Sequence, residues 1–142
     1  MKISTKELEN KIKKAENTEQ LNALLTELPE QNLAVHLQQL CEKNNRTFSQ
    51  VQVASGVTKS LFYAMLNGTR KAKKEHLLKI GMALGLSLEE MNTLLKVAGL
   101  KELYAKNKED AILIFGLNNG LDIMQIEELL TDARCQLHLI ER

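Results

Sequence analysis

The fold is decided by twenty residues, FSQVQVASGVTKSLFYAMLN at positions 48–67. Apolar residues at helical spacing occur on both sides of Gly56, and glycine adopts a positive φ at little cost. Thr47 and Gln50 have the spacing of a capping box, and Thr58 is a suitable N-cap for a second helix. The segment therefore predicts two short helices, at 48–55 and 59–66, joined by a tight turn.

The second of these helices has one apolar face and one outward face. At about 100° per residue, Phe62 and Met65 lie on the buried face, and Val51 and Val57 complete the contact with the first helix. A recognition helix presents its N-terminal residues and its outer face to the edges of DNA bases. The candidate base readers are Lys59, Ser60, Tyr63 and Ala64, with Leu61 as a candidate for contact with a thymine methyl group.

The charge of the chain is unevenly distributed. The net charge of +1 is the sum of −1 over residues 1–45, +6 over 46–79 and −4 over 80–142. A basic segment between acidic ends is what a phosphate-binding surface requires. Directly after the predicted recognition helix, the candidates for phosphate contact are Arg70, Lys71, Lys73 and Lys74, for which the alternative is a solvated loop.

Caps and glycine stops also mark helices elsewhere. The predicted helices are 5–15, 18–28, 31–43, 48–55, 59–66, 74–84, 88–98, 108–118 and 123–139. Residues 111–115 could also be a buried strand, but Asn107 before them and Gly120 after them favour a helix. A single proline and abundant Leu, Lys, Glu, Gln and Ala agree with an all-α fold.

An internal repeat recurs at a spacing of 35 residues. Its unit is a helix, a Gly-Leu turn and a capped second helix. Residues Gly81, Gly85, Leu86, Leu94, Leu95 and Ala98 recur as Gly116, Gly120, Leu121, Leu129, Leu130 and Ala133. Two copies do not predict a solenoid, which generally needs three or more.

Residues 32–91 resemble the Cro/lambda-repressor-like helix-turn-helix family, also called the xenobiotic-response-element type. The resemblance rests on GVT at 56–58, NGTRK at 67–71 and ALGLSLEE at 83–90. Further matching positions are Thr47, Val51, Phe62, Met65 and LLKI at 77–80.

This resemblance implies a five-helix domain that binds double-stranded DNA as a sequence-specific transcriptional regulator. It implies base contacts from Lys59, Ser60 and Ala64. It implies phosphate contacts from Asn67, Thr69, Arg70 and Lys71. We include in the predicted DNA-binding set Thr47, Phe48, Thr58 and Lys73.

Several positions depart from the pattern of that family. Phe48 replaces a polar residue that commonly contacts phosphate, and Gln52 stands where a small residue normally lets the two helices approach. Leu66 takes a place that is usually acidic. Together with Leu61 and Tyr63, it makes the outer face unusually apolar, and exposed apolar patches mark partner sites. An alternative function is therefore a protein-interaction module, such as an adaptor or antitoxin, that uses the same face.

No pattern for catalysis is present. The sequence lacks a glycine-rich phosphate loop, a zinc-protease motif and a nucleophile elbow. The three histidines, His36, His76 and His138, lack the spacing of metal ligands, and Cys41 and Cys135 lack the CxxC spacing of a zinc or redox site. We therefore expect no enzyme activity, no cofactor and no metal.

The N-terminal segment and the longest apolar run indicate where in the cell the protein is expected. The first twenty residues alternate Lys and Glu, without the apolar core of a secretory signal. The longest apolar run, at 111–117, is too short to span a bilayer. We therefore expect a cytoplasmic protein with reduced thiols and no membrane contact.

Three parts are expected along the chain: an N-terminal extension at 1–30, the DNA-binding domain at 31–99 and a C-terminal extension at 100–142. Residues 111–117 are apolar on all sides, which predicts burial on more than one face. Either a second subunit or the helices at 31–43 and 123–139 would cover them. Because symmetric DNA readers span two half-sites, we expect a homodimer.

Overall fold

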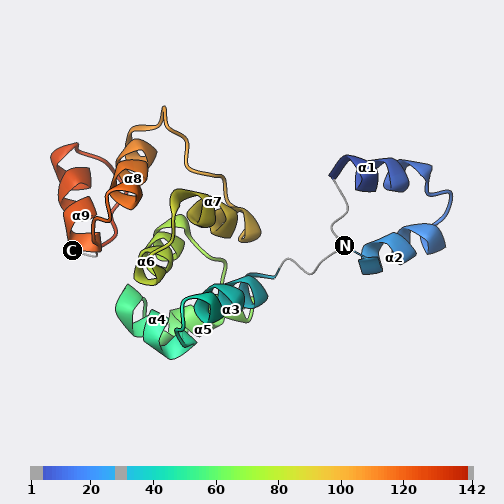
Figure 1. Ribbon diagram of the computed structural model, residues 1–142, viewed down its shortest axis with the longest axis horizontal. Coiled ribbons are helices and arrows are strands. Elements are labelled where there is room, and N and C mark those ends of the chain that lie inside the picture. The colour runs from blue at the N-terminus through green and yellow to red at the C-terminus, as the bar shows by residue number, and fades with distance from the viewer. Residues whose placement is uncertain (1–4, 28–31, 141–142) are drawn as a thin grey trace. The chain divides into compact units, whose positions relative to one another are not determined.

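The computed structural model describes residues 5–27 and 32–140. Within these residues the chain forms nine helices and no strand, which confirms the all-α prediction (Figure 1). Eight of the predicted helices begin and end within two residues of the observed bounds. Positions 28 and 31, which two of those predictions included, lie outside the described residues. The chain divides into two compact units, residues 1–30 and residues 31–142.

The first unit is a hairpin of two ten-residue helices, α1 (Thr5–Lys14) and α2 (Thr18–Glu27). The Asn17 side chain accepts a hydrogen bond from the backbone N–H of Gln20 at 2.8 Å, and the Gln20 side chain accepts one from the N–H of Glu16 at 2.8 Å. These reciprocal bonds satisfy amide groups that the start of α2 would otherwise leave unpaired.

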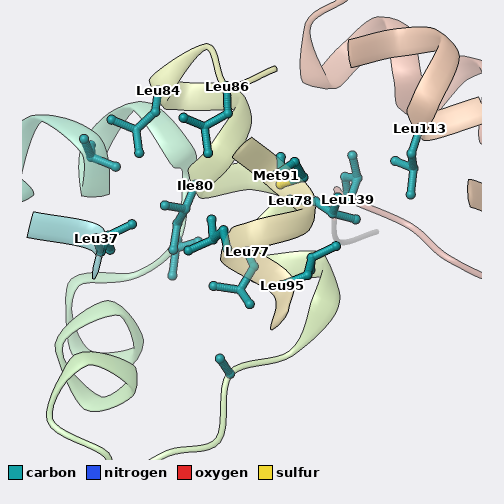
Figure 2. Packing of buried hydrophobic residues seen from close by; sticks show 14 of the residues in the cluster. Leu37, Leu77, Leu78, Ile80, Leu84, Leu86, Met91, Leu95, Leu113 and Leu139 are labelled. Atoms are coloured by element: carbon teal, nitrogen blue, oxygen red, sulfur yellow. The ribbon is translucent and has the colours of Figure 1, made fainter. Parts of the chain in front are cut away.

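The second unit begins with five helices that pack around one apolar core. They are α3 (Leu33–Lys43), α4 (Phe48–Ser55), α5 (Lys59–Leu66), α6 (Lys74–Leu84) and α7 (Leu88–Val97). Helix α4 packs against α3, α5 and α6, and α7 packs against α3 and α6. Figure 2 shows Leu37 of α3, Leu77 and Ile80 of α6, and Met91 and Leu95 of α7 within this core.

Two further helices, α8 (Lys108–Asn118) and α9 (Ile123–Asp132), pack against each other, and α8 also packs against α7. The 35-residue repeat corresponds to two helical hairpins of the same construction. A Cβ atom added at Gly81 would lie 2.2 Å from Cε of Met91, and one added at Gly116 would lie 2.5 Å from Cδ1 of Ile126. In each hairpin, the absence of a side chain at glycine lets the second helix approach closely.

The last helix is shorter than predicted. The prediction of a helix at 123–139 is wrong, because α9 ends at Asp132. Arg134 has a left-handed φ of 58°. The backbone N–H groups of Arg134 and Cys135 donate to the carbonyls of Thr131 and Leu130, each at 3.0 Å. This pair of bonds is a Schellman motif, which satisfies the final carbonyls and stops the helix.

Beyond α9 the chain folds back as a tail. The Glu127 carboxylate accepts from the backbone N–H of Leu139 at 2.8 Å and lies 2.7 Å from Nδ1 of His138. The Glu109 carboxylate accepts from the N–H groups of Gln136 and Leu137 at 3.2 and 3.3 Å. Leu139 is 1% exposed and belongs to the same apolar cluster as the core of the first five helices (Figure 2).

No helix in the described part of the chain combines the length and the apolar character needed to cross a bilayer.

Candidate DNA-binding surface

Helices α4 and α5 meet at a tight turn centred on Gly56. The Thr47 hydroxyl accepts from the N–H of Gln50 at 3.1 Å, and the Gln50 side chain accepts from the N–H of Thr47 at 2.9 Å. At the other end of α4, Gly56 has a φ of 75°. The Thr58 hydroxyl then accepts from the N–H of Leu61 at 3.3 Å and caps α5. The turn and both caps lie where the sequence predicted them.

Two polar side chains, Gln52 and Ser55, stabilise the turn. The side-chain amide of Gln52 donates to the Val57 carbonyl at 2.6 Å. The Ser55 hydroxyl, in a residue only 1% exposed, donates to the Gln52 carbonyl at 2.9 Å and accepts from the N–H of Val57 at 3.2 Å. These bonds explain how Gln52 is accommodated in the place of a small residue. Sequence reasoning missed this role for both side chains.

Aromatic packing holds α5 against the domain. Phe62 is 0% exposed. Its ring lies 6.1 Å from that of Phe48 and 5.4 Å from that of Tyr63, in edge-to-face arrangements. Phe48 is half-buried, so its ring serves packing. Tyr63 remains 37% exposed.

The outer side of α5 is open. Lys59, Ser60 and Tyr63 are exposed, and Ala64 is half-buried. Leu61 differs from the other candidates, because its side chain is half-buried and lines a hollow with residues of α9 and the C-terminal tail. Four of the five predicted base readers therefore lie on or beside the accessible side of the helix, and the fifth lies toward the tail.

The loop after α5 is held to that helix. The side-chain oxygen of Asn67 accepts from the backbone N–H of Thr69 at 2.9 Å and also from its hydroxyl. The backbone N–H of Arg70 donates to the Ala64 carbonyl at 3.1 Å. The predicted phosphate-contacting residues of this loop are all exposed: Asn67, Thr69, Arg70, Lys71 and Lys73.

Four exposed cations lie on α5 and this loop without ion-pair partners in the part of the chain that the structure describes: Lys59, Arg70, Lys71 and Lys73. A positive surface that no carboxylate neutralises attracts the phosphates of nucleic acid.

Residues 32–94 match the profile of a family described as a helix-turn-helix domain. This segment is therefore similar to helix-turn-helix domains. The match spans α3 to α6 and most of α7, and it supports DNA binding by this part of the chain. Searches of curated proteins and of solved structures returned no match.

Lys74 connects the helix-turn-helix domain to α8. Its ammonium group is paired with the Asp110 carboxylate, whose side chain is 8% exposed. The other oxygen of Asp110 accepts from the N–H of Tyr104 at 2.8 Å. A buried carboxylate needs such partners, because an unpaired buried charge is costly. Lys74, a candidate for phosphate contact in the sequence, is therefore already paired with a carboxylate of the same chain.

Among the described residues, no group of three or more His, Cys, Asp or Glu side chains is placed to hold a metal ion. Cys41 and Cys135 are buried and free. Burial, and secondarily the charge of Glu42, raises the pKa of the Cys41 thiol, which lowers its thiolate fraction and its reactivity.

Gly56→Val is expected to lower the free energy of unfolding by more than about 1 kcal/mol. A Cβ at this position would meet nothing within 4 Å, so the cost comes from the left-handed φ of 75° alone. Urea denaturation monitored by circular dichroism measures the change. Gly56→Ala, which lacks the β-branch, should lose less. A Gly56→Val protein as stable as the wild type would show that the backbone at this turn is not left-handed.

Proposed function

We propose that this protein binds double-stranded DNA in a sequence-specific manner through α5 and acts as a transcriptional regulator. The observation that carries the proposal is the combination of an accessible outer face on α5 with a loop directly after it, whose exposed cations have no ion-pair partner among the described residues. The outer face would enter the major groove, and the loop would hold the phosphates on either side.

The proposed contacts divide by chemistry. Lys59 and Ser60 would donate hydrogen bonds to base edges, and Tyr63 and Ala64 would make apolar contacts beside them. Phosphates would be bound by Asn67, Thr69, Arg70, Lys71 and Lys73. Thr47, Phe48 and Thr58 would act by fixing the starts of α4 and α5. We leave Leu61 out of the base-reading set, because its side chain lines the hollow beside the tail.

We further propose that the domain is of the Cro/lambda-repressor-like type. The order of five helices, α3 to α7, and the capped turn at Gly56 support this assignment. In this view residues 31–99 form the DNA-binding domain, and residues 1–30 and 100–142 are extensions.

The alternative function, protein interaction through the same face, has weaker support. Leu61 and Leu66 are half-buried and pack against the core, which leaves Tyr63 as the large apolar side chain exposed on α5. The outward apolar area is therefore smaller than the sequence alone indicated, whereas the cations are accessible.

Binding of duplex DNA is expected to weaken steeply with salt, because each phosphate contact releases counterions. The test is retention of genomic DNA fragments by the purified full chain at increasing salt. Lys59→Ala should relax the preference at one base position, at a cost of about 1–3 kcal/mol on the preferred sequence. Lys101→Ala, which removes an exposed lysine from the loop before α8, is the matched control. Absence of salt-sensitive retention would favour the protein-interaction alternative.

We also propose a homodimer formed by the outer face of α8. Leu113 is 1% exposed on the inner side of this helix, whereas Phe115 is 54% exposed and Ala111, one turn away, is exposed too. An exposed apolar helix face next to a DNA-binding domain favours pairing of two copies.

Phe115→Glu is therefore expected to shift the protein from dimer to monomer, because it places two charges in the proposed interface. Sedimentation velocity over a range of protein concentrations measures the shift. Tyr104→Glu changes another exposed aromatic residue, 60% accessible in the loop before α8, and should leave the dimer intact. A wild-type monomer at all concentrations would overturn this proposal.

A further inference from the structure

A hollow of about 480 Å³ lies between the helix-turn-helix turn and the C-terminal part of the chain. One wall is the end of α4 with the turn, at residues 53–58, together with Leu61 of α5. The opposite wall is formed by the start of α9 and by Leu139 and Ile140 of the tail, and α6 contributes two further residues. Its volume is within the range of about 300–1,000 Å³ that is typical of small-ligand sites.

The walls of this hollow are mainly apolar. The apolar side chains that line it are Val53, Ala54, Val57, Leu61, Ile123, Met124, Leu139 and Ile140. Val53 is 71% exposed and Met124 is 67% exposed, so these two side chains stand at its rim. Large side chains left in water at the edge of a concave apolar surface would be covered by an apolar ligand.

The charge of the lining has one sign. Among the described residues that line the hollow, Lys79 of α6 is the charged one and none is acidic. Lys79 is half-buried and has no ion-pair partner in the described part of the chain. The N-terminus of α5 also borders the hollow, through its N-cap Thr58 and through Leu61. A helix N-terminus carries partial positive charge. The nearby Asp122 carboxylate caps α9 by accepting from the N–H of Gln125 at 2.8 Å and does not line the hollow.

We propose that this hollow binds a small amphiphilic carboxylate, with its apolar chain between Ala54 and Met124 and its carboxylate on the ammonium group of Lys79. A neutral apolar molecule would leave Lys79 without a counter-charge, and a cation would be repelled by it. The ligand class is therefore defined by both the apolar walls and the sign of the charge.

Such a ligand would contact the domain and the C-terminal tail together. It would touch the turn at residues 56–58, which precedes the recognition helix, and Leu61 in the first turn of that helix. It would also touch Leu139 of the tail. Binding would therefore alter the position or mobility of α5 and change DNA affinity. This consequence rests on the proposed function, whereas ligand binding itself does not.

The test is calorimetric titration of the full chain, without DNA, with sodium decanoate below its micellar concentration. Decyltrimethylammonium bromide has the same chain length and the opposite charge. Lys79→Gln removes the cation and keeps a polar side chain that is one atom shorter, and Lys101→Gln is the control for loss of an exposed lysine. Ala54→Trp fills the hollow from an exposed helix position, and circular dichroism checks that each variant is folded.

Saturable binding of decanoate at one site is expected, weakened about tenfold or more by Lys79→Gln and unchanged by Lys101→Gln. Ala54→Trp should abolish it. The proposal is overturned if decanoate does not saturate, if Lys79→Gln binds it as tightly as the wild type, or if the cationic amphiphile binds equally well. Because no DNA is present, these outcomes leave the proposed DNA-binding function untouched.

Discussion

Phe62→Ala is expected to lower the free energy of unfolding by about 3–5 kcal/mol. Phe62 is 0% exposed, and its ring contacts those of Phe48 and Tyr63 where α5 packs on the domain. Its truncation removes apolar contacts and leaves a cavity that the surrounding helices fill only in part. Urea denaturation of the variant and the wild type, followed by the helical circular-dichroism signal at about 220 nm, measures the loss.

Two matched variants make this measurement specific. Phe62→Leu keeps most of the apolar volume and should lose less stability than Phe62→Ala. Tyr104→Ala removes an aromatic ring that is 60% exposed, and it should change stability by no more than about 0.5 kcal/mol. If Phe62→Ala and Tyr104→Ala cost the same, α5 does not pack on the domain as described.

Simultaneous replacement of Arg70, Lys71 and Lys73 by alanine is expected to weaken binding to every DNA sequence, on the order of a hundredfold or more. Each phosphate contact contributes about 0.9 to the slope of log affinity against log salt, so three contacts should flatten the slope by about 2.7. Base preference should be retained, because phosphate contacts position the protein without reading sequence. Fluorescence anisotropy with a labelled duplex, at several salt concentrations, measures both quantities.

The control for this experiment removes the same charge elsewhere. Lys101, Lys106 and Lys108 are exposed and lie in or next to the loop before α8. Their replacement by alanine changes the net charge by the same amount and should leave the salt slope close to that of the wild type. Equal loss in the two triple variants would mean that DNA responds to overall charge, and that the loop after α5 has no special role.

Local signals explain why the helix-turn-helix geometry could be predicted. The capping box at Thr47 and Gln50, the left-handed Gly56 and the cap at Thr58 each depend on residues within one turn of one another. The end of α9 had no glycine to mark it, because Arg134 takes the left-handed position. The 35-residue repeat contained the missing signal, since Arg134 is the repeat equivalent of Gly99, which ends α7 by the same hydrogen bonds.

Tertiary contacts explain what could not be predicted. In the sequence, Lys74 looks like one more cation of a basic run. Its partner Asp110 is 36 residues away, so no local pattern indicates the ion pair. Leu61 was expected on the flank of the helix, as a candidate for contact with a thymine methyl group, but it lines a hollow together with tail residues from a segment predicted as helix. The exposure of Arg70 and Lys71 agrees with expectation, because a short polar loop held by Asn67 stays at the surface.

The central claim, that α5 reads duplex DNA, is tested most directly by selecting bound sequences from a random duplex pool with the full chain at moderate salt. We expect enrichment of one motif, with two inverted half-sites if the protein is a dimer, and loss of preference at one position of each half-site with Lys59→Ala. A pool that shows no enrichment over the input, or a motif that Lys59→Ala and Ser60→Ala leave unchanged, would contradict it.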